Sequence, residues 1–319
     1  MRAFFKSRAW LIRMLAFLLV LSAVLSGLSC LAANLGRNRN PLYNYSTTSF
    51  FAEPRDSIDV LAIGTSNVYS SVEPLEWWHN YGFTGFTWGE ASQRIFETYE
   101  YLKRIYAVQS PRVVLLEIGD LYRDDTRAEV LDSLLKSRIA AVFPIVTYHR
   151  NLGKLSNLGA PLHSVTKGYL LRTQTVSAAG SGDYMADTSA GKAAVNALCA
   201  HELARCVALC RAHGSQVVLL SIPDRSSWND DRHTAVAALA EQLNTPYLDL
   251  NLALRDKIDW KQDTADGGVH LNYRGAQKVT DYLGAYLAET YPLPDHRSDT
   301  AFRAWDSDWT LFSRKLQTL

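Results

Sequence analysis

The chain has 319 residues, of which 47% are hydrophobic and 20% charged, so neither a largely disordered chain nor a multi-pass membrane protein fits. Thirty-three Lys and Arg stand against 32 Asp and Glu, for a formal net charge of +1. Four basic residues fall within the first thirteen positions, which leaves 29 basic and 32 acidic residues, or −3, in residues 14–319. Nucleic-acid binding therefore has no electrostatic support.

An uncharged run of twenty residues, MLAFLLVLSAVLSGLSCLAA, occupies residues 14–33. At a rise of 1.5 Å per residue, a helix of this length crosses a bilayer core of roughly 30 Å. The basic residues before the run predict a cytoplasmic tail over 1–13, a transmembrane signal anchor over 14–33 and an extracytoplasmic remainder. A cleaved signal peptide is the nearest alternative, although its apolar stretch is usually only about 7–15 residues long.

Beyond the anchor, we expect an Asn-rich stalk over 34–55, a folded domain over 56–294 and a C-terminal docking helix over 295–319. Within the domain, short apolar runs predict strands, and segments with helical periodicity alternate with them. Strands are expected at 58–63, 113–116, 217–220 and 247–250, and helices at 91–108, 191–213, 231–244 and after His270. This alternation predicts an α/β domain with a parallel sheet covered on both faces.

Two other segments complete the predicted organisation. Residues 142–190 are rich in Gly, Ser and Thr and show little periodicity, so we expect an insertion at the rim of a site. Cys199, Cys206 and Cys210 lie on one face of a predicted helix, which favours small core residues over metal ligands.

Ligands of parallel α/β sheets bind beyond the carboxyl ends of the strands. The first predicted strand ends in Gly64-Thr65-Ser66-Asn67, which places a serine on a tight turn where a helix can begin. Such a serine is either a helix cap or a nucleophile whose oxyanion the helix N-terminus can stabilise.

The segment 263–272, DTADGGVHLN, places two carboxylates and a histidine in a glycine-broken loop before the last helix. A serine hydroxyl becomes a good nucleophile when an imidazole takes its proton, and the imidazole needs a carboxylate to fix its tautomer. The loop supplies both partners, which makes Ser66 and His270 candidates for nucleophile and general base. The carboxylate can be Asp266 or Asp263, and we favour Asp266.

The Gly-Thr-Ser-Asn turn and the Asp-Gly-Gly-Val-His-Leu-Asn loop resemble the SGNH/GDSL hydrolase superfamily over about residues 56–290. More narrowly, the chain is similar to the membrane-anchored D-alanyl-transfer proteins of teichoic acid assembly and to acetyltransferases of exported polysaccharides. The resemblance implies a flavodoxin-like three-layer α/β/α sandwich with Ser66 as nucleophile, His270 as base and an aspartate that orients it.

This chain departs from the family pattern at three places. Thr65 stands where the family usually has Asp, the spacing from Asp266 to His270 is four rather than three, and the Gly-x-Asn-Asp block is missing after the second predicted strand. The missing asparagine removes one expected oxyanion donor. The remaining expected donors are the backbone N–H groups of Ser66 and Gly89, with Asn67 as a replacement.

The sequence therefore predicts a membrane-anchored extracytoplasmic serine esterase that acts on ester-linked acyl groups of cell-envelope or exported carbohydrate, with no metal or organic cofactor required. One alternative is an O-acyltransferase that depends on an integral-membrane acyl-donor partner. The other is a non-catalytic, glycan-binding scaffold of an envelope assembly complex.

Overall fold

A five-stranded parallel sheet forms the centre of the computed structural model, which describes residues 2–122, 126–178, 182–187 and 194–318. Its strands are β1 (Val60–Gly64), β2 (Gly85–Gly89), β3 (Val113–Glu117), β4 (Gln216–Ser221) and β5 (Tyr247–Asp249), in the order β2-β1-β3-β4-β5. The predicted parallel sheet is confirmed. Strand β2 is not among the predicted strands, because Gly-Phe-Thr-Trp-Gly has a glycine at each end and resembles a turn.

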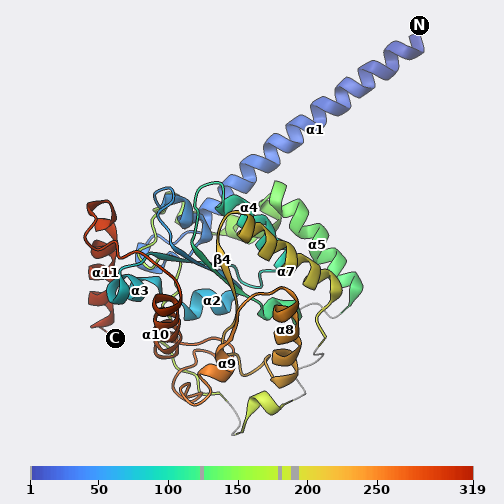
Figure 1. Cartoon of the computed structure of the whole chain (residues 1–319). Helices are drawn as coiled ribbons and strands as arrows, with labels where there is room; N and C mark the ends of the chain where they lie inside the picture. The colour runs from blue at the N-terminus through green and yellow to red at the C-terminus, as the bar shows by residue number, and fades with distance from the viewer. Residues whose placement is uncertain (1, 123–125, 179–181, 188–193, 319) are drawn as a thin grey trace.

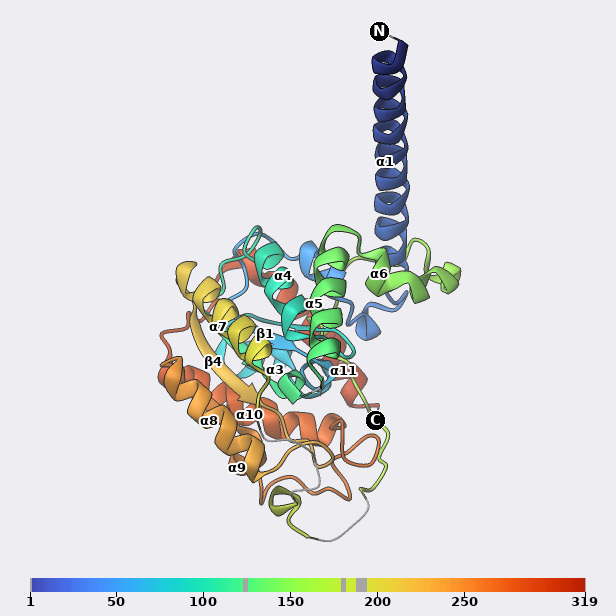
Figure 2. The same cartoon turned by 90° about the vertical axis from the view of Figure 1, so that its right-hand side faces the viewer.

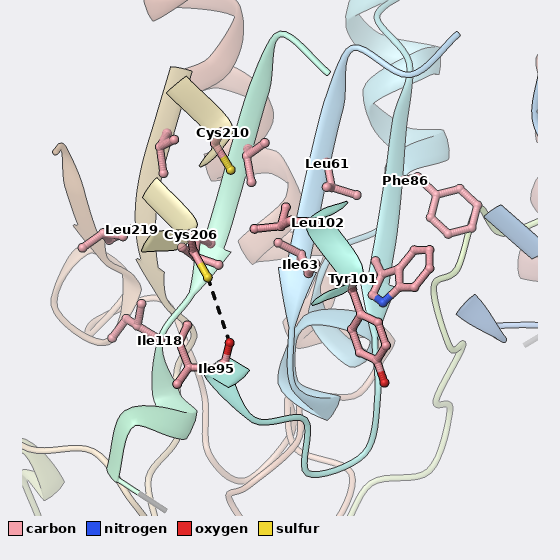
Figure 3. Packing of buried hydrophobic residues seen from close by; sticks show 14 of the residues in the cluster. Leu61, Ile63, Phe86, Ile95, Tyr101, Leu102, Ile118, Cys206, Cys210 and Leu219 are labelled. Atoms are coloured by element: carbon pink, nitrogen blue, oxygen red, sulfur yellow. Dashed lines mark hydrogen bonds between the residues drawn. The ribbon is translucent and has the colours of Figure 1, made fainter. Parts of the chain in front are cut away.

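Helices cover both faces of the sheet (Figure 1), which confirms the three-layer sandwich. Alternate residues of β1 enter different cores: Leu61 and Ile63 pack on one face, whereas Val60 and Ala62 pack on the other. The first face is covered by α4 (Ile95–Ile105), α5 (Arg127–Val142), α7 (Ala197–Ala212) and α8 (Asp230–Gln242), and the second by α2 (Ser66–Ser71), α3 (Pro74–Tyr81), α9 (Leu250–Ala253) and α10 (Tyr273–Thr290). Figure 3 shows Cys206 and Cys210 in the first core, where both are fully buried.

The N-terminal helix α1 (Arg2–Leu35) projects from one end of the domain (Figures 1 and 2). Its part Ala9–Leu35 is long and apolar enough to cross a membrane. Part of the segment 34–55, for which we expect a stalk, packs against the domain. Phe50 lies fully buried in the domain, with its ring 5.0 Å from that of Phe86 and 5.3 Å from that of Trp88. Burial of this large apolar side chain holds the Asn-rich segment against the domain.

The segment 142–190 does not form a site rim throughout. Its first part, with α6 (Ile145–Tyr148), packs against α1. Its middle part runs beside β2, where the Lys167 carbonyl accepts a hydrogen bond from the backbone N–H of Thr87 at 2.9 Å. An edge strand offers unpaired N–H groups, and this segment pairs the one of Thr87.

The C-terminal segment docks on the domain through α11 (Arg303–Leu316). Phe312 is fully buried and Trp305 nearly so, and the Trp305 ring lies 5.6 Å from that of Trp78 in α3. The helix therefore covers α3 and extends the core beyond the sandwich.

Candidate active site

The turn after β1 presents Ser66 as the first residue of α2. Thr65 caps the helix, because its side chain accepts a hydrogen bond from the backbone N–H of Asn67 at 3.3 Å. The serine is therefore free of the capping role that the sequence left open for it. Its own backbone N–H stands at the first helical position, where N–H groups have no acceptor within the helix.

A buried carboxylate supports this turn from below. Glu117, at the end of β3, accepts hydrogen bonds from the backbone N–H of Thr65 at 2.9 Å and of Gly119 at 2.6 Å. Burial raises the pKa of Glu117, and these two donors oppose the rise. A Cβ at Gly64 would lie 2.6 Å from the Glu117 Oε2, so only glycine lets the carboxylate come this close.

The loop that carries His270 closes on itself before α10. Thr264 and Leu271 form an isolated antiparallel bridge, and the backbone N–H of Ala265 donates to the His270 carbonyl at 2.9 Å. Gly267 and Gly268 adopt φ angles of 89° and 121°, which residues with a side chain rarely adopt. The two glycines accommodate the extra residue of the Asp-to-His spacing and return the chain so that Asp266 and His270 meet.

A continuous hydrogen-bonded chain joins Ser66, His270 and Asp266. The His270 Nε2 lies 2.8 Å from the Ser66 Oγ, and its Nδ1 lies 2.5 Å from the Asp266 Oδ2. The backbone N–H of His270 donates to the other Asp266 oxygen at 2.9 Å. Partial burial acts to raise the pKa of Asp266, but the hydrogen bonds from His270 outweigh it and hold that pKa below its usual value.

The alternative carboxylate, Asp263, has a different set of contacts. It is fully buried, forms an ion pair with Lys278 and accepts a hydrogen bond from the backbone N–H of Asp259 at 2.7 Å. The structure thus brings Asp266, and not Asp263, to the imidazole.

The expected oxyanion donors differ in position. Asn67 lines a cavity of about 340 Å³ together with Ser66 and His270, and its side-chain amide donates to Asp224 at 3.4 Å. Gly89 is buried at the end of β2, outside the lining of this cavity, where a Cβ would lie 2.9 Å from the Thr65 carbonyl oxygen. The geometry favours Asn67 and the Ser66 N–H over Gly89 as groups that a ligand oxygen can reach.

Several polar residues of this cavity were not assigned a role from sequence. Ser92, Asp120, Ser226 and Arg232 line it along with the nucleophile candidate. Asp120 is nearly buried, and its Oδ2 has no hydrogen-bond partner in the part of the chain that the structure describes. Burial and the neighbouring Glu117 raise the pKa of Asp120 well above its usual value. The rule of searching after each strand points to the loops of Ser92, Asp120 and Ser226, whereas Arg232 lies within α8 and carries no such signal.

Comparisons with known proteins give likenesses only among solved structures: no family model and no curated protein matches the chain. A GDSL-like lipase from Bacteroides thetaiotaomicron is 15% identical, with 78% of this chain and 98% of that chain covered, at a TM-score of 0.38. A structure from Desulfitobacterium hafniense, described as a lipolytic protein of the G-D-S-L family, is 11% identical, with 72% and 98% covered and a TM-score of 0.39. The sandwich itself is established by the strand order and the helices on its two faces.

Proposed function

We propose that this protein is a membrane-anchored, extracytoplasmic serine esterase that acts on ester-linked acyl groups of cell-envelope or exported carbohydrate. The hydrogen-bonded chain from Ser66 through His270 to Asp266 is the observation that carries the proposal. The polar lining of the adjacent cavity, with Ser92, Ser226 and Arg232, supports a hydroxyl-rich substrate.

The proposed reaction uses these groups in two steps. The Ser66 Oγ attacks the ester carbonyl carbon while the His270 Nε2 takes its proton, and Asp266 stabilises the imidazolium that forms. The Ser66 N–H and the Asn67 amide would face the oxyanion. Collapse of the tetrahedral intermediate breaks the ester C–O bond, and His270 returns the proton to the leaving alcohol. A water molecule, activated by His270, then releases the acid from the acyl-serine.

Transfer to a carbohydrate hydroxyl differs from hydrolysis only in the acceptor of the second step. The apolar helix α1 supports this variant, because an anchor places the domain beside an integral-membrane acyl-donor partner. The basic residues before the apolar run support a cytoplasmic N-terminus and an extracytoplasmic domain.

A fluorophosphonate probe tests the proposal on the full chain in detergent. Wild-type protein should be labelled, whereas Ser66→Ala and His270→Ala should not. His149→Ala, which removes an exposed histidine elsewhere on the surface, should label as wild type does. Release of acetate from an acetylated polysaccharide by the same proteins tests the substrate class. A folded wild-type protein that is not labelled would overturn the esterase.

A further inference from the structure

An unusually apolar surface surrounds the base of α1. Seven large apolar side chains of α5, α6 and the segment that follows are between 40 and 66% exposed: Leu131, Leu135, Ile139, Val142, Val146, Leu155 and Leu158. They include the four most exposed apolar side chains that the described part of the chain has outside α1. We call these seven residues the basal surface. Exposed apolar patches of this kind on the surface of a folded domain mark an interaction site.

Helix α5 has apolar side chains on two sides, so packing against the domain buries only some of them. Val130 is buried and Leu134 packs against the core, while Leu131 and Leu135 point outward at 45% and 60% exposure. Ile139 continues the outer stripe at the spacing of a helix face. A helix with apolar residues on its outer side as well needs a second cover.

The position of the surface relative to α1 indicates which cover this is. Figure 1 shows α5 on the side of the domain from which α1 leaves, and Figure 2 shows α6 at the base of α1. Contacts fix this arrangement: the Ser29 Oγ accepts a hydrogen bond from the backbone N–H of Ile145 at 2.9 Å, and Ala32 and Leu35 are fully buried. The domain thus packs against one side of α1 from Ser29 onward.

The free length of α1 is too short for the bilayer by itself. Between Arg13, the last charged residue before the apolar run, and Ser29 there are fifteen residues, 14–28. They span about 22 Å, which is roughly 8 Å less than a hydrocarbon core of about 30 Å. With Arg13 at the cytoplasmic boundary, the base of the domain therefore enters the opposite leaflet to about the depth of interfacial helices, roughly 5–10 Å.

The charge around the basal surface suits lipid headgroups. The segments 34–52 and 143–158 contain Arg37, Arg39, Arg150 and Lys154 and no acidic residue, and α5 adds three basic residues against two acidic ones. Arg39 also ties the two segments together, because its Nη2 donates to the Leu158 carbonyl at 3.1 Å. Basic side chains beside inserted apolar ones are typical of elements that lie in a membrane interface.

We propose that the basal surface lies in the interfacial layer of the outer leaflet, so that the domain rests on the membrane as well as being tethered by α1. This proposal rests on the membrane anchor of the proposed function. A second copy of the chain or an integral-membrane partner would cover the same residues with protein instead of lipid, and the test separates these occupants.

Spin labels on the full chain in lipid nanodiscs provide the test. Single cysteines for labelling replace Leu135, Leu158, Leu252 or Leu19. The background is Cys30→Ser, because Cys30 is the exposed native cysteine, whereas the other three are buried and can stay. Leu19 reports on the anchor, and Leu252 is an exposed leucine of α9, away from the basal surface. We expect oxygen to relax the labels at 135 and 158 more than a water-soluble nickel chelate does, and the reverse at 252.

The outcomes separate the basal surface from the anchor. If the nickel chelate relaxes the labels at 135 and 158 as strongly as the label at 252, while the label at 19 is relaxed mainly by oxygen, membrane contact of the basal surface is refuted and the anchor is not. Protection of 135 and 158 from both reagents would show a protein cover and also refute the proposal. A water-exposed label at 19 would overturn the anchor itself, whereas fluorophosphonate labelling of Ser66 would still report separately on the chemistry.

Discussion

Replacing Asp266 with asparagine tests whether His270 needs a carboxylate as its partner. Asp266 accepts two hydrogen bonds from His270, one from Nδ1 at 2.5 Å and one from the backbone N–H at 2.9 Å. An amide has one accepting and one donating end, so it can satisfy only one of these N–H groups. When its oxygen keeps the backbone N–H, its NH₂ faces Nδ1 and selects the tautomer that carries the proton on Nε2.

That tautomer cannot take the proton of Ser66, because the Nε2 that faces the hydroxyl is already protonated. The corresponding Asp-to-Asn change in a serine protease triad lowers kcat by about 10⁴. At about 1.36 kcal/mol for each tenfold change, this is roughly 5.4 kcal/mol of transition-state stabilisation. We expect a loss of the same order for Asp266→Asn, since both of its acceptor positions are in use.

The rate constant for fluorophosphonate labelling of Ser66 measures this loss over a series of pH values. Asp256→Asn is the matched control, because Asp256 is an exposed carboxylate nearby in the chain. The control should label at the wild-type rate. A rate for Asp266→Asn within about tenfold of wild type, less than 1.4 kcal/mol, would refute the role given to the carboxylate.

Three further outcomes follow from packing and charge. Gly64→Ala places a Cβ 2.5 Å from that of Glu117, so it should cost about 1–3 kcal/mol in thermal unfolding and slow Ser66 labelling, whereas Gly153→Ala, with open space around it, should change neither. Phe312→Ala removes a fully buried ring and should lower the free energy of unfolding by about 3–5 kcal/mol in denaturant titration. Because folding lowers the pKa of Asp266, the ionised carboxylate stabilises the fold fully above about pH 4, and this stabilisation is lost as the pH falls through the lowered pKa. The free energy of unfolding of Asp266→Asn should therefore lack this small pH-dependent loss in acid.

The sequence predicts those strands whose own residues form a recognisable apolar run. Strands β1, β3 and β4 are runs of mostly apolar, buried residues, and β5 is a shorter, partly buried strand; the predicted bounds of all four lie within a few residues of the observed ones. Strand β2 was not predicted, because its strand character comes from pairing with β1, where Gly64 aligns with Gly89. The packing of the segment 34–55 on the domain has no local pattern either, because it depends on one buried ring, that of Phe50, among polar residues.

In the candidate site, too, some residues can be predicted from a local sequence pattern and others cannot. Ser66 and His270 carry local signals, a serine on the turn after a strand and a histidine in a glycine-broken loop. The bond between Asn67 and Asp224 joins residues 157 positions apart, and no local pattern predicts it. Similarly, the spacing alone could not decide between Asp263 and Asp266, because the choice depends on the φ angles of the glycines between them and His270.

The placement of the sheet relative to α1 restricts the substrates of the proposed enzyme. Helices α8 and α9, which follow the carboxyl ends of β4 and β5, lie at the end of the domain away from α1 (Figures 1 and 2). Ser66 follows β1 at the same edge of the sheet. On the proposed topology this edge faces away from the membrane, and the buried contacts of α1 leave no free stalk that would let the domain turn over.

A site held in this way cannot reach an ester within the bilayer on which its own domain rests. It can reach a polymer that extends outward from the membrane or passes by it. We therefore expect acyl groups on a soluble acetylated polysaccharide to be released, and phospholipid esters of the surrounding nanodisc to remain intact under the same conditions. Cleavage of the nanodisc lipids, with no release from the polysaccharide, would place the substrate at the membrane and contradict this orientation.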